Sequence, residues 1–138
     1  MTRNVVVVAA LLIATTAFNT SAVAADKCPV GEAGASNFQT AVTTAVKTAW
    51  SCSGAYQTLE ACQLGSTADN ALSDIVLAKC EPVFLPKATP AIKSAYQKAK
   101  DKCSQIAAKK EGSMYQGQAA VCMARAGRDF ARKYAVKR

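Results

Sequence analysis

Two cysteines on either side of Gly112 constrain the fold more than any other feature of this sequence. Cys103 lies nine residues before Gly112, and Cys122 lies ten residues after it. If Gly112 ends one helix and Ser113 caps the next, a rise of about 1.5 Å per residue brings the two sulfurs to nearly the same height in an antiparallel hairpin. We therefore expect a disulfide between Cys103 and Cys122 that holds two helices together.

The other four cysteines extend this framework. The chain has six cysteines and no histidine, and an even count in an exported chain of this size predicts three disulfides. The closest pair, Cys52 and Cys62, has nine residues between its members, which is too many for a typical metal-binding pair, so we expect no metal or cofactor. A hairpin turning at Gly65 favours Cys52 with Cys80 and leaves Cys28 for Cys62. A local bridge between Cys52 and Cys62, with Cys28 bound to Cys80, is an equally good alternative.

The first 24 residues have the three zones of a secretory signal peptide. Arg3 precedes an apolar run over residues 5–14, and small residues follow at 22–24. Polar residues from Thr15 onward interrupt the run before it reaches the about 20 apolar residues that a transmembrane helix needs. We therefore expect residues 1–24 to be removed, and residues 25–138 to form one disulfide-rich helical domain in the periplasm or outside the cell, with no transmembrane segment.

Helix signals recur throughout residues 25–138, and strand-like alternation is nearly absent. Capping-box patterns start at Ser36 and Ser113, and further starts are expected at 66–67 and at Thr89 followed by Pro90. A short helix is expected over about 55–63, and three prolines predict a connector over 81–90. The fold class predicted is all-α, a small bundle of about five helices stapled by three disulfides. The helical spacing places these side chains inward in the last two helices: Ile92, Tyr96, Ala99, Cys103, Ile106, Tyr115, Ala119, Cys122, Ala126, Phe130 and Tyr134.

Charge is distributed unevenly along the chain. Residues 25–86 hold three Lys and six acidic residues, net −3, whereas residues 87–138 hold thirteen basic and three acidic residues, net +10. Such a positive region attracts polyanions, although basic residues on exposed helix faces also serve solubility alone. The possible anion-binding face consists of Lys93, Lys98, Lys100, Lys102, Lys109, Arg125, Arg128 and Arg132.

Catalysis and nucleic-acid binding find little support in the sequence. Nucleophilic catalysis needs a base beside Ser or Cys, and here histidine is absent and the cysteines are expected to be disulfide-bonded. The few carboxylates mostly lie beside helix starts or basic residues. Asp69 and Asp74, for example, fall where they favour the dipole of the third helix. No nucleic-acid-binding motif or row of exposed aromatics accompanies the basic residues. We therefore expect a binding protein that is not an enzyme.

The spacing and local sequence of the second half resemble the LprI-type lysozyme-inhibitor domain. The resemblance spans about residues 52–132 and rests on Cys52-x9-Cys62, the segments 68–73 and 95–103, and Glu111-Gly112-Ser113-Met114 with Cys122 and Arg128. It implies a small exported helical domain, a bridge between Cys52 and Cys62, and binding or inhibition of a lysozyme in the periplasm.

Three hypotheses for function follow. The first is lysozyme inhibition, which the family resemblance implies. The second is a cationic envelope-associated protein that binds lipopolysaccharide or anionic lipid, as the charge of residues 87–138 indicates. The third is a structural subunit of an envelope complex. The expected partner is therefore a lysozyme-like protein or an anionic envelope surface, and no nucleic acid.

Overall fold

The computed structural model describes residues 27–31 and 35–135, and the predicted signal peptide, residues 1–24, lies outside them. Over the described residues the chain is all-helical, without a strand, which confirms the predicted fold class. The first helix begins one residue before the predicted cap Ser36. The elements are α1 (Ala35–Thr48), α2 (Cys52–Cys62), α3 (Ala68–Phe84), the 3-10 helix η1 (Leu85–Lys87), α4 (Pro90–Ala108) and α5 (Ser113–Tyr134).

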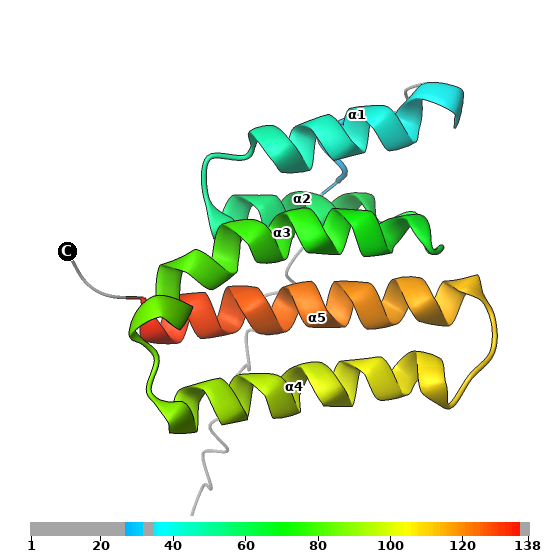
Figure 1. Cartoon of the computed structure of the whole chain (residues 1–138). Helices are drawn as coiled ribbons and strands as arrows, with labels where there is room; N and C mark the ends of the chain where they lie inside the picture. The colour runs from blue at the N-terminus through cyan, green and yellow to red at the C-terminus, as the bar shows by residue number, and fades with distance from the viewer. Residues whose placement is uncertain (1–26, 32–34, 136–138) are drawn as a thin grey trace, which may run out of the picture.

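Helix α5 lies at the centre of the bundle (Figure 1). It packs against α2, α3 and α4, whereas α1 covers α2 and α3 on the side away from α4. The helices run back and forth, so that the ends of α1, α3 and α5 meet the starts of α2 and α4 at one end of the bundle, on the left of Figure 1. Residues from distant parts of the sequence therefore gather at that end.

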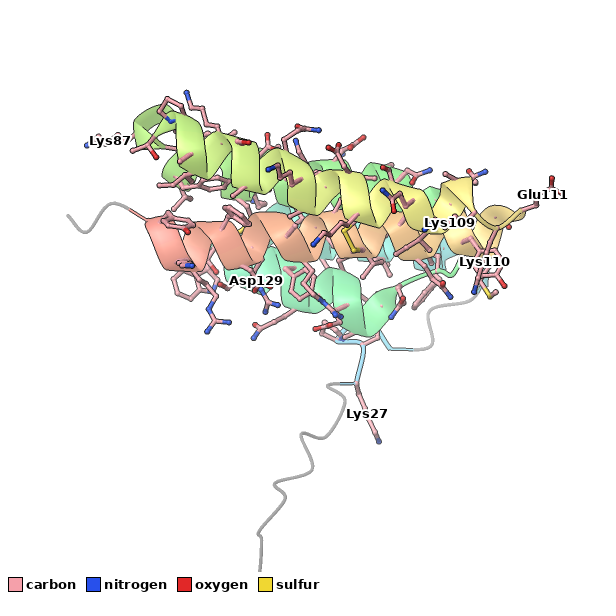
Figure 2. All side chains as sticks on the ribbon, turned by 90° about the horizontal axis from the view of Figure 1, so that it is seen from below. Lys27, Lys87, Lys109, Lys110, Glu111 and Asp129 are labelled. Carbon is pink, nitrogen blue, oxygen red and sulfur yellow. A yellow bond between two sulfur atoms is a disulfide. The ribbon has the colours of Figure 1, made fainter. Side chains whose placement is uncertain are left out.

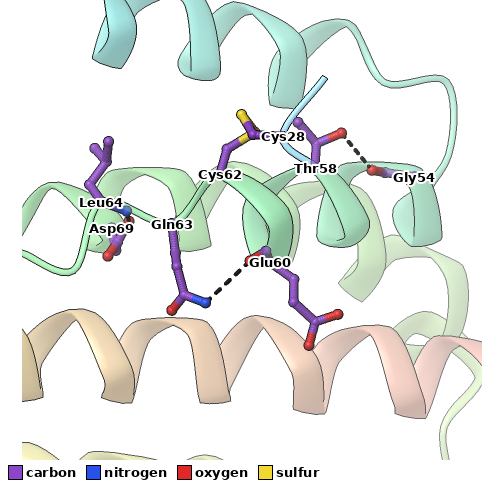
Figure 3. Close-up of a disulfide and its surroundings, with 8 residues drawn as sticks. All are labelled: Cys28, Gly54, Thr58, Glu60, Cys62, Gln63, Leu64 and Asp69. Atoms are coloured by element: carbon purple, nitrogen blue, oxygen red, sulfur yellow. Dashed lines mark hydrogen bonds between the residues drawn. A yellow bond between two sulfur atoms is a disulfide. The ribbon is translucent and has the colours of Figure 1, made fainter. Parts of the chain in front are cut away.

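Three disulfides join these elements. The predicted pair Cys103–Cys122 is confirmed, as are Cys52–Cys80 and Cys28–Cys62, so the alternative pairing is wrong. The bridge between Cys52 and Cys62 that the family resemblance implied is also wrong. These two residues are the first and last of α2, so they lie about 15 Å apart along the helix axis, whereas a disulfide needs Cα atoms within about 7 Å. Figure 3 shows the bridge that ties Cys28 to the end of α2 instead.

The proline-rich connector is shorter than predicted. Helix α3 continues through Pro82 to Phe84, although a proline ring removes one backbone hydrogen bond and crowds the preceding turn. The side chain of Phe84 is only 1 % exposed and meets the ring of Tyr96 edge-to-face at 5.1 Å between centroids. Burying this aromatic pair offsets the cost of the proline, because local preference is weak compared with packing.

The predicted helix starts agree with the observed positions, but the groups that cap the helices are not always the predicted ones. Thr89 caps α4 as expected, since its Oγ1 accepts from the backbone N–H of Ile92 at 3.3 Å. Thr67 precedes α3 without a side-chain cap. Ser113 lies inside α5, and the N-cap is Gly112 with φ of 113°. The predicted capping box at Ser113 is therefore wrong, because a left-handed glycine turns the chain there in place of a serine side chain.

Asp69 organises the turn between α2 and α3. Its side chain is fully buried, and its carboxylate accepts from the backbone N–H groups of Leu64 at 2.8 Å, Gly65 at 2.8 Å and Ser66 at 3.3 Å. Figure 3 shows Asp69 directed toward Leu64. The sequence-based interpretation of Asp69 as a partner of the helix dipole is incomplete, because the carboxylate mainly satisfies the donors of this turn.

The most buried face of α5 is made of small residues. The predicted seam does face α4, since Cys122 bonds Cys103 and the ring of Phe130 lies 5.1 Å from that of Tyr96. A second face, however, packs more closely on α3 and the α2–α3 turn, and it lets the helix backbones approach. Its members are Gly117, Ala120, Ala124, Gly127 and Ala131.

Candidate binding surface

The lysines of α4 form two separate rows. A helix turns by about 100° per residue, which places Lys98, Lys102 and Lys109 within about 40° of one another and Lys93 on the other side of the exposed face. All four are exposed, and within the described part of the chain they take part in no ion pair or cation–π contact. Figure 2 shows Lys109 near one end of the bundle and Lys87 at the other.

Lys100 has a structural role instead. Its Nζ lies 3.4 Å from Oε1 of Glu81 on α3 and 4.6 Å from the centre of the Tyr96 ring. The hydroxyl of Tyr96 donates to the same carboxylate oxygen at 2.8 Å. Burial, reinforced by the bond to Glu81, raises the pKa of Tyr96 far above its ordinary value. This cluster joins α4 to the end of α3, so the charge of Lys100 is compensated within the protein.

Arg125 is likewise engaged, in a cluster between α2 and α5. Its Nε donates to the hydroxyl of Tyr56 at 2.7 Å, and its terminal nitrogen lies 2.8 Å from Oε1 of Glu60. The Tyr56 hydroxyl donates to the same oxygen of Glu60 at 2.6 Å. That hydrogen bond, together with Arg125, holds the pKa of Glu60 below its usual range, while burial raises the pKa of Tyr56. The guanidinium of Arg128 completes the cluster, 4.2 Å from the centre of the Tyr56 ring.

Arg132 belongs to a hollow at the end of the bundle where α5 stops. The hollow has a volume of about 400 Å³, and Trp50, Lys79 and Val83 line it together with Arg132. Trp50 follows α1, with 95 % of its side chain exposed, and also borders a second hollow of about 550 Å³. The helix ends at Thr48, so the indole points to solvent.

The structure therefore divides the predicted anion-binding face. Three of its members are tied to acidic or aromatic side chains: Lys100, Arg125 and Arg128. The remaining five are exposed cations without an ion-pair or cation–π partner among the described residues: Lys93, Lys98, Lys102, Lys109 and Arg132.

Sequence reasoning missed the hollow beside Trp50. Its lining comes from the α1–α2 link, the start of α2, the end of α3 and the end of α5, which no local pattern brings together. One signal was available in the sequence. The single tryptophan of the chain stands next to Ser51 and Cys52 at a predicted helix boundary, where no helix face is present to bury a large aromatic side chain.

Within residues 27–31 and 35–135, no group of three His, Cys, Asp or Glu side chains is placed to hold a metal ion. In the same ranges, no helix combines the length and apolar character that crossing a membrane requires. Comparison of the chain with models of protein families, with curated proteins and with solved structures gave no match.

Proposed function

We propose that this protein is an exported binding protein that attaches to an anionic surface of the cell envelope, either lipopolysaccharide or anionic lipid. The observation that carries the proposal is the set of five exposed cations on α4 and α5 that have no ion-pair or cation–π partner among residues 27–31 and 35–135. The three disulfides fit an oxidising compartment, the periplasm or the exterior of the cell.

Three acidic side chains among residues 25–86 are engaged within the fold, whereas Asp74 is exposed. Glu60 and Glu81 are paired with Arg125 and Lys100, and Asp69 is buried in its turn. A cation near an anionic membrane surface contributes about 1 kcal/mol of attraction. A few such residues therefore suffice for reversible attachment that depends on ionic strength, because exposed charges are screened over about 10 Å at 0.1 M salt.

Sedimentation with vesicles tests the proposal. The oxidised protein is mixed with vesicles of phosphatidylcholine alone, with vesicles that also contain phosphatidylglycerol, and with lipopolysaccharide aggregates, each at low and high salt. We expect the protein to sediment with the two anionic preparations at low salt and to be released at high salt. Equal binding to neutral vesicles, or no binding to either anionic preparation, would refute the proposal.

Lysozyme inhibition is the second candidate. The exposed row of Lys98, Lys102 and Lys109 lies on a helix braced by a disulfide, which is the kind of rigid element that can enter an acidic catalytic cleft. Common lysozymes are basic, however, so a cationic half slows their association. Clearing of a cell-wall suspension by several lysozymes, with and without the oxidised protein, tests this candidate. Stoichiometric protection that persists at high salt and is lost on reduction would place it ahead of attachment to lipid.

A further inference from the structure

The end of the bundle that carries Trp50 combines exposed apolar side chains with cations. Among the described residues, the large hydrophobic side chains that are exposed are Trp50 at 95 %, Val83 at 40 % and Met114 at 48 %. Trp50 and Val83 line the same hollow, whereas Met114 lies at the start of α5, at the opposite end of the bundle (Figure 1). The exposed apolar surface is therefore concentrated beside Trp50.

The cations at this hollow are available to a ligand. Lys79 and Arg132 both line it, and neither forms an ion pair in the part of the chain that the structure describes. None of the described residues that line it is acidic. The hydroxyl-bearing residues Ser51 and Ser53 complete the polar side. A phosphate group placed in this hollow would meet two cations and no carboxylate of the described lining.

We propose that this hollow binds the headgroup phosphate of an anionic phospholipid in a bilayer, with Trp50 and Val83 reaching the interface between headgroups and acyl chains. Tryptophan is enriched at this interface because its ring is apolar and its N–H finds a polar partner. Lys79 and Arg132 supply the charge complementarity. The inference rests on the proposed function and locates its contact surface at the Trp50 end of the bundle.

The single tryptophan provides a direct probe. Trp50 is the only tryptophan of the chain, so its fluorescence reports on this end of the bundle when tyrosine is not excited, and the variants below assign the signal to the hollow. With vesicles that contain phosphatidylglycerol, we expect the emission to shift to the blue and brominated phosphatidylglycerol to quench it. Neutral phosphatidylcholine vesicles and inorganic phosphate should leave the emission unchanged. Inorganic phosphate producing the same shift would overturn a bilayer site in favour of a site for a soluble anion.

Matched variants locate the contact. Trp50→Ala should weaken vesicle binding about tenfold, because the variant lacks the apolar ring surface that the wild type buries in the bilayer interface. The double variant Lys79→Gln/Arg132→Gln should weaken it about thirtyfold, from roughly 1 kcal/mol per cation. The control Lys102→Gln/Lys109→Gln removes the same charge from α4, away from the hollow, and should weaken binding about threefold, because these lysines add to the general attraction but lie farther from the bilayer contact. All these side chains are exposed or partly exposed, and circular dichroism verifies the fold of each variant.

The outcomes separate this inference from the proposed function. The protein could sediment with anionic vesicles without a shift of Trp50 emission, or the control variant could bind as weakly as Lys79→Gln/Arg132→Gln. Either result would mean that the contact lies elsewhere. The inference would then be overturned while the proposed function stands. If no variant or wild-type protein binds anionic vesicles, the proposed function itself fails. A shift of Trp50 emission caused only by an added protein would replace the lipid by a protein partner.

Discussion

Replacing Gly117 by Ala should destabilise the protein much more than the same change at Gly127. Both glycines are buried in α5, so both variants gain about 1 kcal/mol from the higher helix propensity of Ala. At Gly117 an added Cβ would lie 2.7 Å from the carbonyl oxygen of Ser66, 2.8 Å from Oδ2 of Asp69 and 2.9 Å from the nitrogen of Ser66. These atoms have little freedom, because Asp69 holds the turn through backbone N–H groups, including that of Leu64.

The magnitudes follow from what each Cβ meets. Overpacking of this kind costs about 1–3 kcal/mol, and weakening the hydrogen bonds of Asp69 adds about 1–3 kcal/mol. We therefore expect Gly117→Ala to lower the free energy of unfolding by about 1–5 kcal/mol once the gain of about 1 kcal/mol in helix propensity is subtracted. At Gly127 the nearest atom is Cδ2 of Leu77 at 2.6 Å. It is the end of a flexible side chain whose displacement costs about 0.5–1.5 kcal/mol, so Gly127→Ala should stay within about 1 kcal/mol of the wild type.

Equilibrium unfolding in urea, followed by far-ultraviolet circular dichroism on the oxidised protein, measures both changes. A lower midpoint with an unchanged slope isolates the loss of stability in Gly117→Ala from any change in the surface exposed on unfolding. The reasoning is refuted if Gly117→Ala unfolds at the wild-type midpoint, or if Gly127→Ala is the less stable of the two.

Two further predictions concern acid stability and the hairpin disulfide. The pKa of Glu60 is lowered, first by the hydrogen bond from Tyr56 and then by Arg125, so its stabilisation is present above its usual pKa of 4.5 and is lost as pH falls through the lower folded value. In thermal unfolding, the stability of Glu60→Gln should therefore fall less steeply below about pH 4.5 than that of the wild type. The difference in the free energy of unfolding should be less than about 1 kcal/mol, because the ion pair is half exposed. An identical loss of stability with falling pH would contradict this role. The double variant Cys103→Ser/Cys122→Ser opens a loop of 19 residues and should lose about 3 kcal/mol in urea unfolding, and an unchanged midpoint would show that the bridge does not constrain the hairpin.

The helical framework and the cysteine pairing could be predicted because both depend on local rules. Proline at the start of α4, glycine before α5 and apolar spacing along each helix fix the element boundaries to within a few residues. Once two helices run antiparallel, their rise per residue decides which cysteines reach the same height. The disulfide between Cys103 and Cys122 was therefore predicted directly. The partner of Cys52 stayed open, because Cys62 and Cys80 were equally good candidates from the sequence.

The candidate site could be predicted only in part. The sequence identifies Lys93, Lys98 and the other cations, but not which of them the fold compensates. Lys100 and Arg125 are paired with carboxylates that are 19 and 65 residues away in the chain. These two cations are therefore not free to bind an external anion. These pairs form because α3 and α2 pack beside α4 and α5 in the folded bundle. The spacing of residues within α4 or α5 does not predict that packing.

The sequence by itself determined an all-helical, disulfide-linked chain with its positive charge in the last two helices, because helix propensity, spacing and charge are properties of neighbouring residues. Only the tertiary structure decided that Asp69 is buried in a turn, that Gly117 must lack a side chain, and that Trp50 stands exposed beside Lys79 and Arg132. The physical reason is that burial and contact depend on which helix faces meet. That choice is made by the packing of the whole bundle around α5, and local preference along the chain is too weak to set it.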